Sequence, residues 1–189
     1  MVADRVNPRR FYAMALFDGK LFESVDGAAH FAERPLVLPD GLPRRGGGGK
    51  DNRTDRGDDR GGQDRIYATP GREGELWLAS YDGLYHSPAA GKDFVRMPSV
   101  EQIHAFGFGK AAPHASKAGR AAALYLVGTV QGQRGFFRST DGGATWVRIN
   151  DDQHQWGLVL QITGDPKTFG RVYVGTHGRG TFYGDPKIR

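Results

Sequence analysis

Short runs of aromatic and β-branched residues recur along the chain, each followed by a turn that contains glycine and then by a second short apolar run. The pattern occurs in the segments 10–31, 75–94, 123–146 and 171–185. In the third segment Leu124-Tyr125-Leu126 precedes the turn and Phe136-Phe137 follows it. Two strands of about five residues around a glycine-containing turn form a β-hairpin. The sequence therefore predicts a series of related hairpins.

In the first three segments the second strand ends at a serine that begins a further turn. The third turn reads Ser139-Thr140-Asp141-Gly142-Gly143-Ala144-Thr145-Trp146, and the second has Ala89 where the others have Asp. The carboxylate can accept backbone N–H groups of its own turn, glycine supplies positive φ, and the aromatic residue can anchor the next strand in the core. This pattern, S-x-D-G-x-x-x-[FW], is the Asp-box, and we expect its residues to be structural rather than catalytic: Ser24, Asp26, Phe31, Ser139, Asp141, Gly142 and Trp146.

The spacing of these turns predicts the fold class. The serines at 24, 87 and 139 lie 63 and then 52 residues apart, a period that fits the four-stranded blades of a β-propeller. If the strands of a blade are A to D, the hairpin is B–C, and 102–109, 158–164 and, more weakly, 65–71 are A strands. We expect an all-β fold, a partial propeller of Asp-box (BNR-type) blades. Its three and a half or so blades cover roughly 1–38, 65–98, 101–150 and 157–185, the first without its A strand and the last without its D strand.

Such an array has two open radial faces and unpaired strand edges, which are liable to dock or aggregate. We therefore interpret the chain as the C-terminal fragment of a larger propeller, or as a protomer that needs a partner. The missing last strand would come from the remaining blades of the same parent chain, or from self-association.

Turns alternate between the two faces of a meander blade, so the connections between blades lie opposite the Asp-boxes. Loops carry function more often than blade walls do. The connection 149–157, "INDDQHQWG", offers a flat indole ring at Trp156 for a sugar ring and several groups that can bond to hydroxyls: Asp151, Asp152, Gln153, His154 and Gln155. An equally weighted alternative is that Trp156 plugs the blade junction while His154 and Asp152 bond to the backbone.

The other long connection contains residues 44–65, which include no apolar residue, and we expect it to be disordered or a mobile flap. Its "GGGGK" lacks the spacing of a phosphate loop, and "DNRTDRGDD" lacks the Gly and Glu of a calcium loop. One His beside two Asp at 149–157 is not a metal-ligand pattern. The sequence predicts no cofactor and no metal.

Composition excludes several classes of protein. The 29 glycines and 11% aromatic residues fit an all-β chain with many tight turns. The net charge is +5, but the basic residues are scattered, which argues against nucleic-acid binding. The chain has no cysteine, no apolar run of the roughly 20 residues that a membrane span requires, and no apolar signal-peptide core at its N-terminus.

Two long segments, "FFRSTDGGATWVRINDDQHQWG" and "ITGDPKTFGRVYVGTHGRGTFYGD", resemble the C-terminal end of glycoside hydrolase family 74. "GREGELWLASYDGLYHS" and "FGFGKAAP" fit the same region, so the resemblance covers nearly the whole chain except 44–65. This family comprises xyloglucan-cleaving endo-β-1,4-glucanases and reducing-end-specific cellobiohydrolases.

The resemblance implies a secreted parent enzyme with two seven-bladed propellers, a substrate cleft between them, and an inverting pair of Asp residues as general acid and base. No position here matches either catalytic motif, so we assign no catalytic residue and expect the chain to be inactive alone. It implies xyloglucan or a related β-glucan as the partner of the cleft. The candidate sugar contacts are Trp156, His154, Gln155, Tyr81 and His177.

Two other functions are weighed against this one. A non-catalytic Asp-box propeller that binds glycans or proteins would share the same turns. A sialidase-like enzyme would need three converging arginines, and the candidates Arg138, Arg148, Arg171 and Arg179 do not fall at equivalent blade positions.

Overall fold

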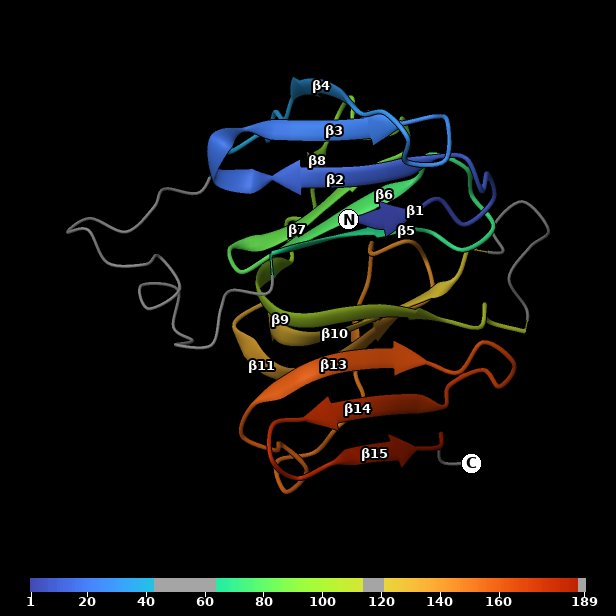
Figure 1. Ribbon diagram of the computed structural model, residues 1–189. Helices are drawn as coiled ribbons and strands as arrows, with labels where there is room; N and C mark the ends of the chain where they lie inside the picture. The colour runs from blue at the N-terminus through green and yellow to red at the C-terminus, as the bar shows by residue number, and fades with distance from the viewer. Residues whose placement is uncertain (43–63, 114–120, 187–189) are drawn as a thin grey trace. The chain divides into compact units, whose positions relative to one another are not determined.

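The computed structural model describes residues 1–42, 64–113 and 121–186, so the predicted flap lies outside the described residues except at 64 and 65. The chain divides into two compact units, Met1–Met97 and Pro98–Arg189. The described residues form fifteen strands in four antiparallel sheets and one short 3-10 turn, Leu16–Asp18 (Figure 1). The all-β prediction is confirmed.

The first unit contains two meander sheets, in each of which every strand pairs with the next along the chain. The first sheet consists of β1 (Val2–Ala3), β2 (Phe11–Ala15), β3 (Lys20–Ser24) and β4 (Ala32–Pro35). The second consists of β5 (Arg65–Ala68), β6 (Leu76–Ser80), β7 (Gly83–Ser87) and β8 (Val95–Arg96).

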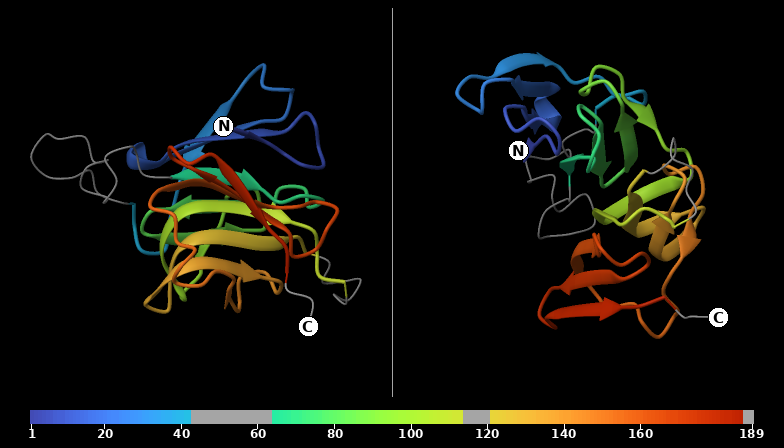
Figure 2. Two further views of the ribbon diagram at one scale, coloured as in Figure 1. Left: turned by 90° about the horizontal axis from the view of Figure 1, so that it is seen from below. Right: turned by 90° about the vertical axis from the view of Figure 1, so that its right-hand side faces the viewer.

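The second unit repeats this arrangement. Its four-stranded sheet consists of β9 (Val100–Gly109), β10 (Ala123–Val130), β11 (Gln133–Ser139) and β12 (Val147–Arg148). Its three-stranded sheet consists of β13 (Val159–Gly164), β14 (Val172–Thr176) and β15 (Thr181–Gly184). The two sheets of this unit meet where β13 lies along β9 (Figure 2).

The expectation that the first sheet lacks its A strand is wrong. Val2 pairs with Tyr12 and Ala3 with Phe11, so β1 opens the sheet as a two-residue strand. The turn that follows is closed by Asp4, whose Oδ1 accepts the backbone N–H groups of Val6 (2.8 Å) and Asn7 (2.9 Å). A strand of two residues is too short to show periodicity, so the pattern of the sequence did not reveal it. The last sheet has three strands, as predicted.

In each unit the core fills the space between its two sheets. Tyr12, Leu21, Leu76 and Leu78 are almost fully buried in the first unit, and Tyr125 and Ile162 in the second. The sheets of the second unit approach so closely that a Cβ at Gly107 would overlap the backbone oxygen of Ile162. Each Å² of apolar surface removed from water contributes about 25 cal/mol to the free energy of folding. The apolar packing between the sheets is therefore the main source of stability.

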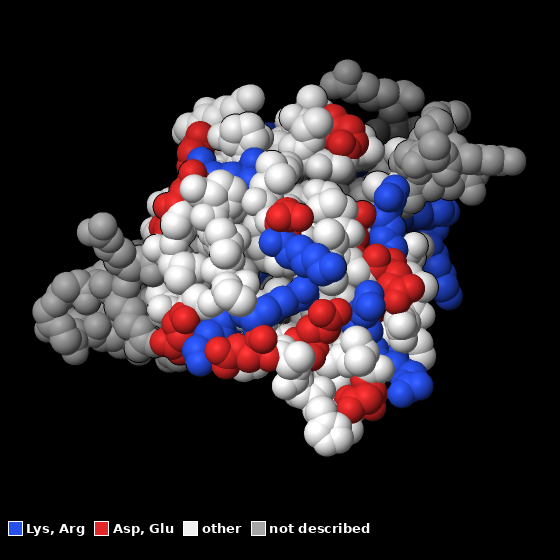
Figure 3. All heavy atoms as spheres, turned by 90° about the horizontal axis from the view of Figure 1, so that it is seen from above, with Lys and Arg blue, Asp and Glu red and all other residues white. Residues whose placement is uncertain are grey.

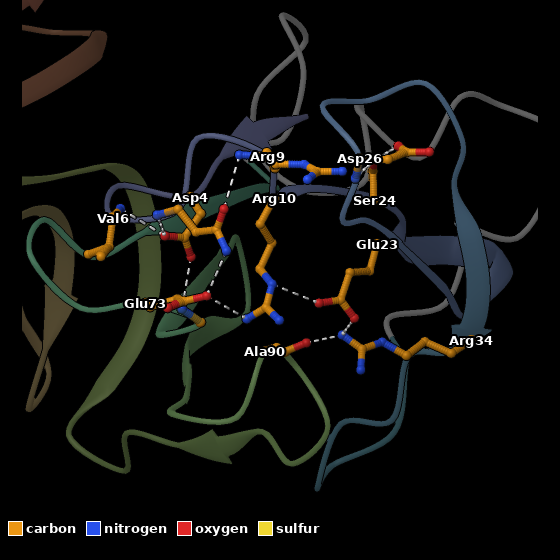
Figure 4. Close-up of polar contacts among 12 residues, drawn as sticks. Asp4, Val6, Arg9, Arg10, Glu23, Ser24, Asp26, Arg34, Glu73 and Ala90 are labelled. Carbon is orange, nitrogen blue, oxygen red and sulfur yellow. Dashed lines mark hydrogen bonds and ion pairs between the residues drawn. The ribbon is translucent and has the colours of Figure 1, made fainter.

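Polar contacts also join the two sheets of the first unit (Figure 4). Arg10 lies between the carboxylates of Glu23 and Glu73, 3.4 Å from each, and Arg34 pairs with Glu23 at 3.2 Å and donates to the Ala90 carbonyl. Charges of both signs also lie side by side on the face over β3 and β4 (Figure 3), where Lys20 bonds to Glu33 at 3.0 Å. Partly exposed pairs of this kind contribute modestly each.

The turns that begin at Ser24 and Ser139 contain the same hydrogen bonds. The serine hydroxyl donates to Asp26 or Asp141 at 2.8 Å and accepts an N–H four residues on, from Ala28 (3.0 Å) or Gly143 (2.9 Å). Hydrogen bonds to Asp141 outweigh its burial and lower the pKa of this carboxyl. Ser87 accepts the Gly91 N–H at 3.0 Å in the same way, although Ala89 brings no carboxylate.

The sequence predicts that the aromatic residue that ends each turn anchors the core. The structure shows this in some copies but not in all. Phe94 is buried in the core between the two sheets of the first unit, and Trp146 is half-buried. Phe31, by contrast, is 39% exposed. Phe94 packs toward the preceding sheet, whereas no sheet precedes that of Phe31 among the described residues. The expectation of a buried anchor at Phe31 is therefore wrong for this chain.

Candidate functional site

In the second unit, the connection between β12 and β13 meets the turn between β14 and β15. The backbone N–H of His177, at the start of that turn, donates to the Leu158 carbonyl at 2.9 Å. The side chains of Asp151, His154 and Gln155 in the connection are exposed, and so is His177. Residues from two loops thus share one edge of this unit, as the alternation of turns predicts.

Asn150 is the centre of the connection. Its Oδ1 accepts the backbone N–H of Phe136 on β11 at 2.8 Å, and its Nδ2 donates to the carbonyls of Asp151 (3.0 Å) and His154 (2.9 Å). Arg148, on β12, donates its Nε to the same Oδ1 at 3.3 Å. The Asn150 amide therefore ties the connection to β11.

Asp151 and His154 form an exposed pair within this frame. Nδ1 of His154 lies 2.6 Å from Oδ1 of Asp151, which also accepts the backbone N–H groups of Gln153 and His154, each at 3.0 Å. The hydrogen bond with the His154 ring, followed by these backbone bonds, lowers the pKa of Asp151. Asp152 accepts a bond from Arg148 at 2.7 Å. Asp151 therefore favours the ionised state.

Trp156 is half-buried and packs against the core of the second unit. Its ring centroid lies 5.6 Å from that of Phe136 and 5.0 Å from that of Phe182 on β15. Its φ is +33°, an uncommon value for a bulky residue. The junction packing that the sequence left open is therefore present, and the role of Trp156 as a sugar contact stays a prediction.

Tyr81 belongs to the first unit. It is half-buried at the turn between β6 and β7, and its N–H donates to Oδ1 of Asp64 at 3.1 Å. A cavity of about 260 Å³ opens beside this turn, lined by Asp40, Gly41, Leu42, Ser80, Asp82, Tyr85 and Arg96. Arg96 pairs with Asp40 at 3.0 Å, and burial raises the pKa of Tyr85. The sequence did not single out this cavity.

Sequence reasoning also missed Asn150, and it considered Arg148 only as a candidate arginine of a sialidase-like enzyme. Acidic residues, histidine and tryptophan are the residue types that usually bind sugar hydroxyls or stack on sugar rings, and Asn150 is none of these. The one local signal for Asn150 is that Asn side chains commonly bond to the backbone of their own loop. Among the described residues no group of three or more His, Cys, Asp or Glu side chains is arranged to hold a metal ion. Nor does any helix in these residues have the length and apolar character to cross a membrane.

Meander sheets of four strands, with polar connections gathered at one edge of the blade, define the chain as part of a β-propeller. No family model matches it. It is 45% identical to a xyloglucanase from Paenibacillus sp. over 98% of its own length and 16% of that protein. It is 40% identical to a xyloglucanase from Acetivibrio thermocellus, of which it covers 19%, and 34% identical to an oligoxyloglucan-reducing end-specific xyloglucanase from Emericella nidulans, of which it covers 21%.

Two solved structures extend the likeness to the fold. A GH74 enzyme from Niastella koreensis superposes with a TM-score of 0.79 at 35% identity, over 99% of this chain and 24% of that one. The GH74 xyloglucanase from Xanthomonas campestris gives a TM-score of 0.72 at 39% identity, over 98% and 23%. By sequence and by fold, the chain is homologous to one segment of the family 74 glycoside hydrolases, as its motifs predicted. It spans about a fifth of the length of the curated relatives it matches.

Proposed function

We propose that the chain forms part of the substrate-binding cleft of a xyloglucan-degrading endo-β-1,4-glucanase, where it supplies cleft wall and sugar contacts. The observation that carries this proposal is the connection 149–157, which presents exposed polar side chains on a hydrogen-bonded frame in a chain 45% identical to a xyloglucanase. Oligosaccharides are recognised by a few well-placed polar groups beside apolar rings. His154, Gln155 and Trp156 offer that combination, and His177 lies on the adjoining turn.

We propose that the chain does not hold the complete acid–base pair, because Asp151 does not suit the general acid. A general acid needs a raised pKa so that it holds its proton at neutral pH. Asp151 has the opposite shift, because His154 and two backbone N–H groups stabilise its charge. Asp152 is held by Arg148 at 2.7 Å. We therefore expect no hydrolysis by the chain alone.

The partner we propose is the rest of the propeller. The three-stranded sheet ends at β15, whereas each of the other three sheets in the described residues has a fourth strand beyond its third. A strand from the parent polypeptide, or from a second copy, would complete it. The proposed substrate is a polymer that cells do not take up intact, so we propose that the parent enzyme is secreted.

Reducing-sugar release from xyloglucan tests the proposal. The 189-residue chain is assayed alone, and then mixed with the remaining blades of its parent polypeptide, made separately. We expect release in the mixture only. Release by the chain alone would place the acid and base within it and return attention to Asp151 and Asp152. If neither the chain alone nor the mixture releases reducing sugar, and oligosaccharide binding is retained, the result would favour a non-catalytic binding propeller.

A further inference from the structure

A polar bracket formed by Arg148 and Asn150 fixes the start of the connection 149–157. The Asn150 amide uses its carbonyl oxygen toward β11 and both hydrogens of its NH₂ group toward the carbonyls of Asp151 and His154. Arg148 contacts Asn150 through Nε at 3.3 Å and Asp152 through an Nη at 2.7 Å. The bracket thus spans from the β11–β12 sheet to the residue two positions before Trp156.

Gly135 makes room for this bracket. A Cβ at this position would lie 2.7 Å from Nε of Arg148 and 2.9 Å from Oδ1 of Asn150, closer than real side chains tolerate. Gly135 does not have a positive φ, so the requirement is for space and not for backbone freedom. The absence of a side chain at Gly135 therefore lets Asn150 pack against β11.

Beyond the bracket the chain passes through a strained residue. Trp156 has a φ of +33°, and such a conformation in a bulky residue persists only where its surroundings hold it. On one side Asn150 holds the His154 carbonyl at 2.9 Å, and on the other the His177 N–H holds the Leu158 carbonyl at 2.9 Å. Strain of this kind gathers at functional sites, where it preorganises a binding group.

We propose that Asn150 is the positioning residue of this connection: its two N–H···O=C bonds hold His154 and Trp156 in the geometry that binds sugar. That the connection binds sugar rests on the function proposed above. That Asn150 fixes the conformation of the connection does not depend on it. The residue acts through its neighbours and need not touch the glucan.

Asn150→Asp separates positioning from folding. The aspartate keeps an oxygen acceptor for the Phe136 N–H and for Arg148, so the anchor to β11 survives. It loses both donors, so the carbonyls of Asp151 and His154 are released. Asn150→Ala removes both halves, and Gly135→Ala displaces the bracket without changing its members. Gly157→Ala is the matched control, because Gly157 lies in the same connection, a Cβ there meets nothing within 4 Å, and it belongs to neither the bracket nor the predicted sugar contacts.

The experiment uses the full-length polypeptide that carries this chain and has two readouts. Amide hydrogen exchange follows the N–H groups of Phe136, Gln153 and His154. Calorimetry with a xyloglucan oligosaccharide, together with steady-state kinetics, gives Kd, KM and kcat. For Asn150→Asp we expect slow exchange at Phe136, faster exchange at Gln153 and His154, an affinity about tenfold weaker, and a rise in KM with kcat within about twofold.

Each outcome decides the proposal. Faster exchange in Asn150→Asp with unchanged affinity overturns it, and so does slow exchange at all three amides. An equal loss of affinity in Gly157→Ala would show that any change in the connection weakens binding, which also refutes a specific role for Asn150. If the unsubstituted protein binds no oligosaccharide, the proposed function fails and with it the sugar-binding part of this proposal. The exchange data then still decide whether Asn150 fixes the connection.

Discussion

Asp4 ties the first sheet of the chain to the second, and its replacement should cost more than that of any exposed acid. Only 6% of the residue is exposed, and its carboxylate accepts three backbone N–H groups. Two come from its own turn, Val6 and Asn7, and the third comes from Gly74, in the turn between β5 and β6 of the next sheet, at 2.8 Å from Oδ2. Burial raises the pKa of Asp4, but the three hydrogen bonds and the nearby Arg10 outweigh it, so the pKa is lowered.

The magnitude follows from the exposure of the three donors. Gly74 is buried, so its N–H would lose its partner without gaining water, at about 1–3 kcal/mol. Val6 is exposed and Asn7 half-buried, so water can replace much of what they lose, and each adds about 0.5 kcal/mol. We expect Asp4→Ala to lower the free energy of unfolding by about 3 kcal/mol. Asp4→Asn keeps one acceptor oxygen and should lose about half as much.

Urea denaturation at pH 7 measures both variants against Asp93→Ala, which removes an exposed carboxylate from the same unit. The pH dependence gives a second check. Because the folded pKa of Asp4 lies below the unfolded value of about 3.9, its stabilisation is complete above that value and is lost as the pH falls through the folded pKa. The difference between wild type and Asp4→Ala should therefore shrink as the pH falls below that unfolded value. A cost no larger than that of Asp93→Ala, or a difference independent of pH, would refute this account.

Substitutions at two further positions, Gly107 and Trp156, test the junction between the sheets of the second unit. Gly107→Ala forces a Cβ into the backbone oxygen of Ile162. We expect thermal melts to show that it lowers the free energy of unfolding by about 2 kcal/mol or more. The control Gly157→Ala places a Cβ in open space and should change this free energy by less than about 0.5 kcal/mol. Trp156→Ala removes a ring packed on Phe136 and should cost about 2–3 kcal/mol, while Trp156→Phe should cost less than about 1.5 kcal/mol. If Trp156→Phe nevertheless weakens oligosaccharide binding, the indole contacts sugar as well as the core. Equal stability of Trp156→Ala and Trp156→Phe would show that the packing of the ring contributes nothing.

Much of the fold was predictable because its signals are local. Short runs of aromatic and β-branched residues, a glycine turn and a Ser-x-Asp turn each act within a few residues, and they correctly indicated the hairpins and the three-stranded last sheet. The sequence did not predict the two-residue strand β1, because pairing of Val2 with Tyr12 depends on a turn closed by Asp4 and not on any pattern in the strand. Phe31 showed the opposite failure. Its local pattern matches that of Phe94, but whether such a ring is buried depends on the neighbouring sheet.

The sequence by itself determined the class of the candidate site, an exposed connection with polar side chains beside an indole, in a chain that resembles family 74. Only the tertiary structure decided how that connection is held. Asn150 bonds to Phe136, fourteen residues away, and fits over Gly135, while Trp156 packs against Phe182 from a different sheet. Those contacts join segments that no short window of sequence brings together. Their existence depends on how two adjacent sheets pack, and that packing is a property of the assembled fold.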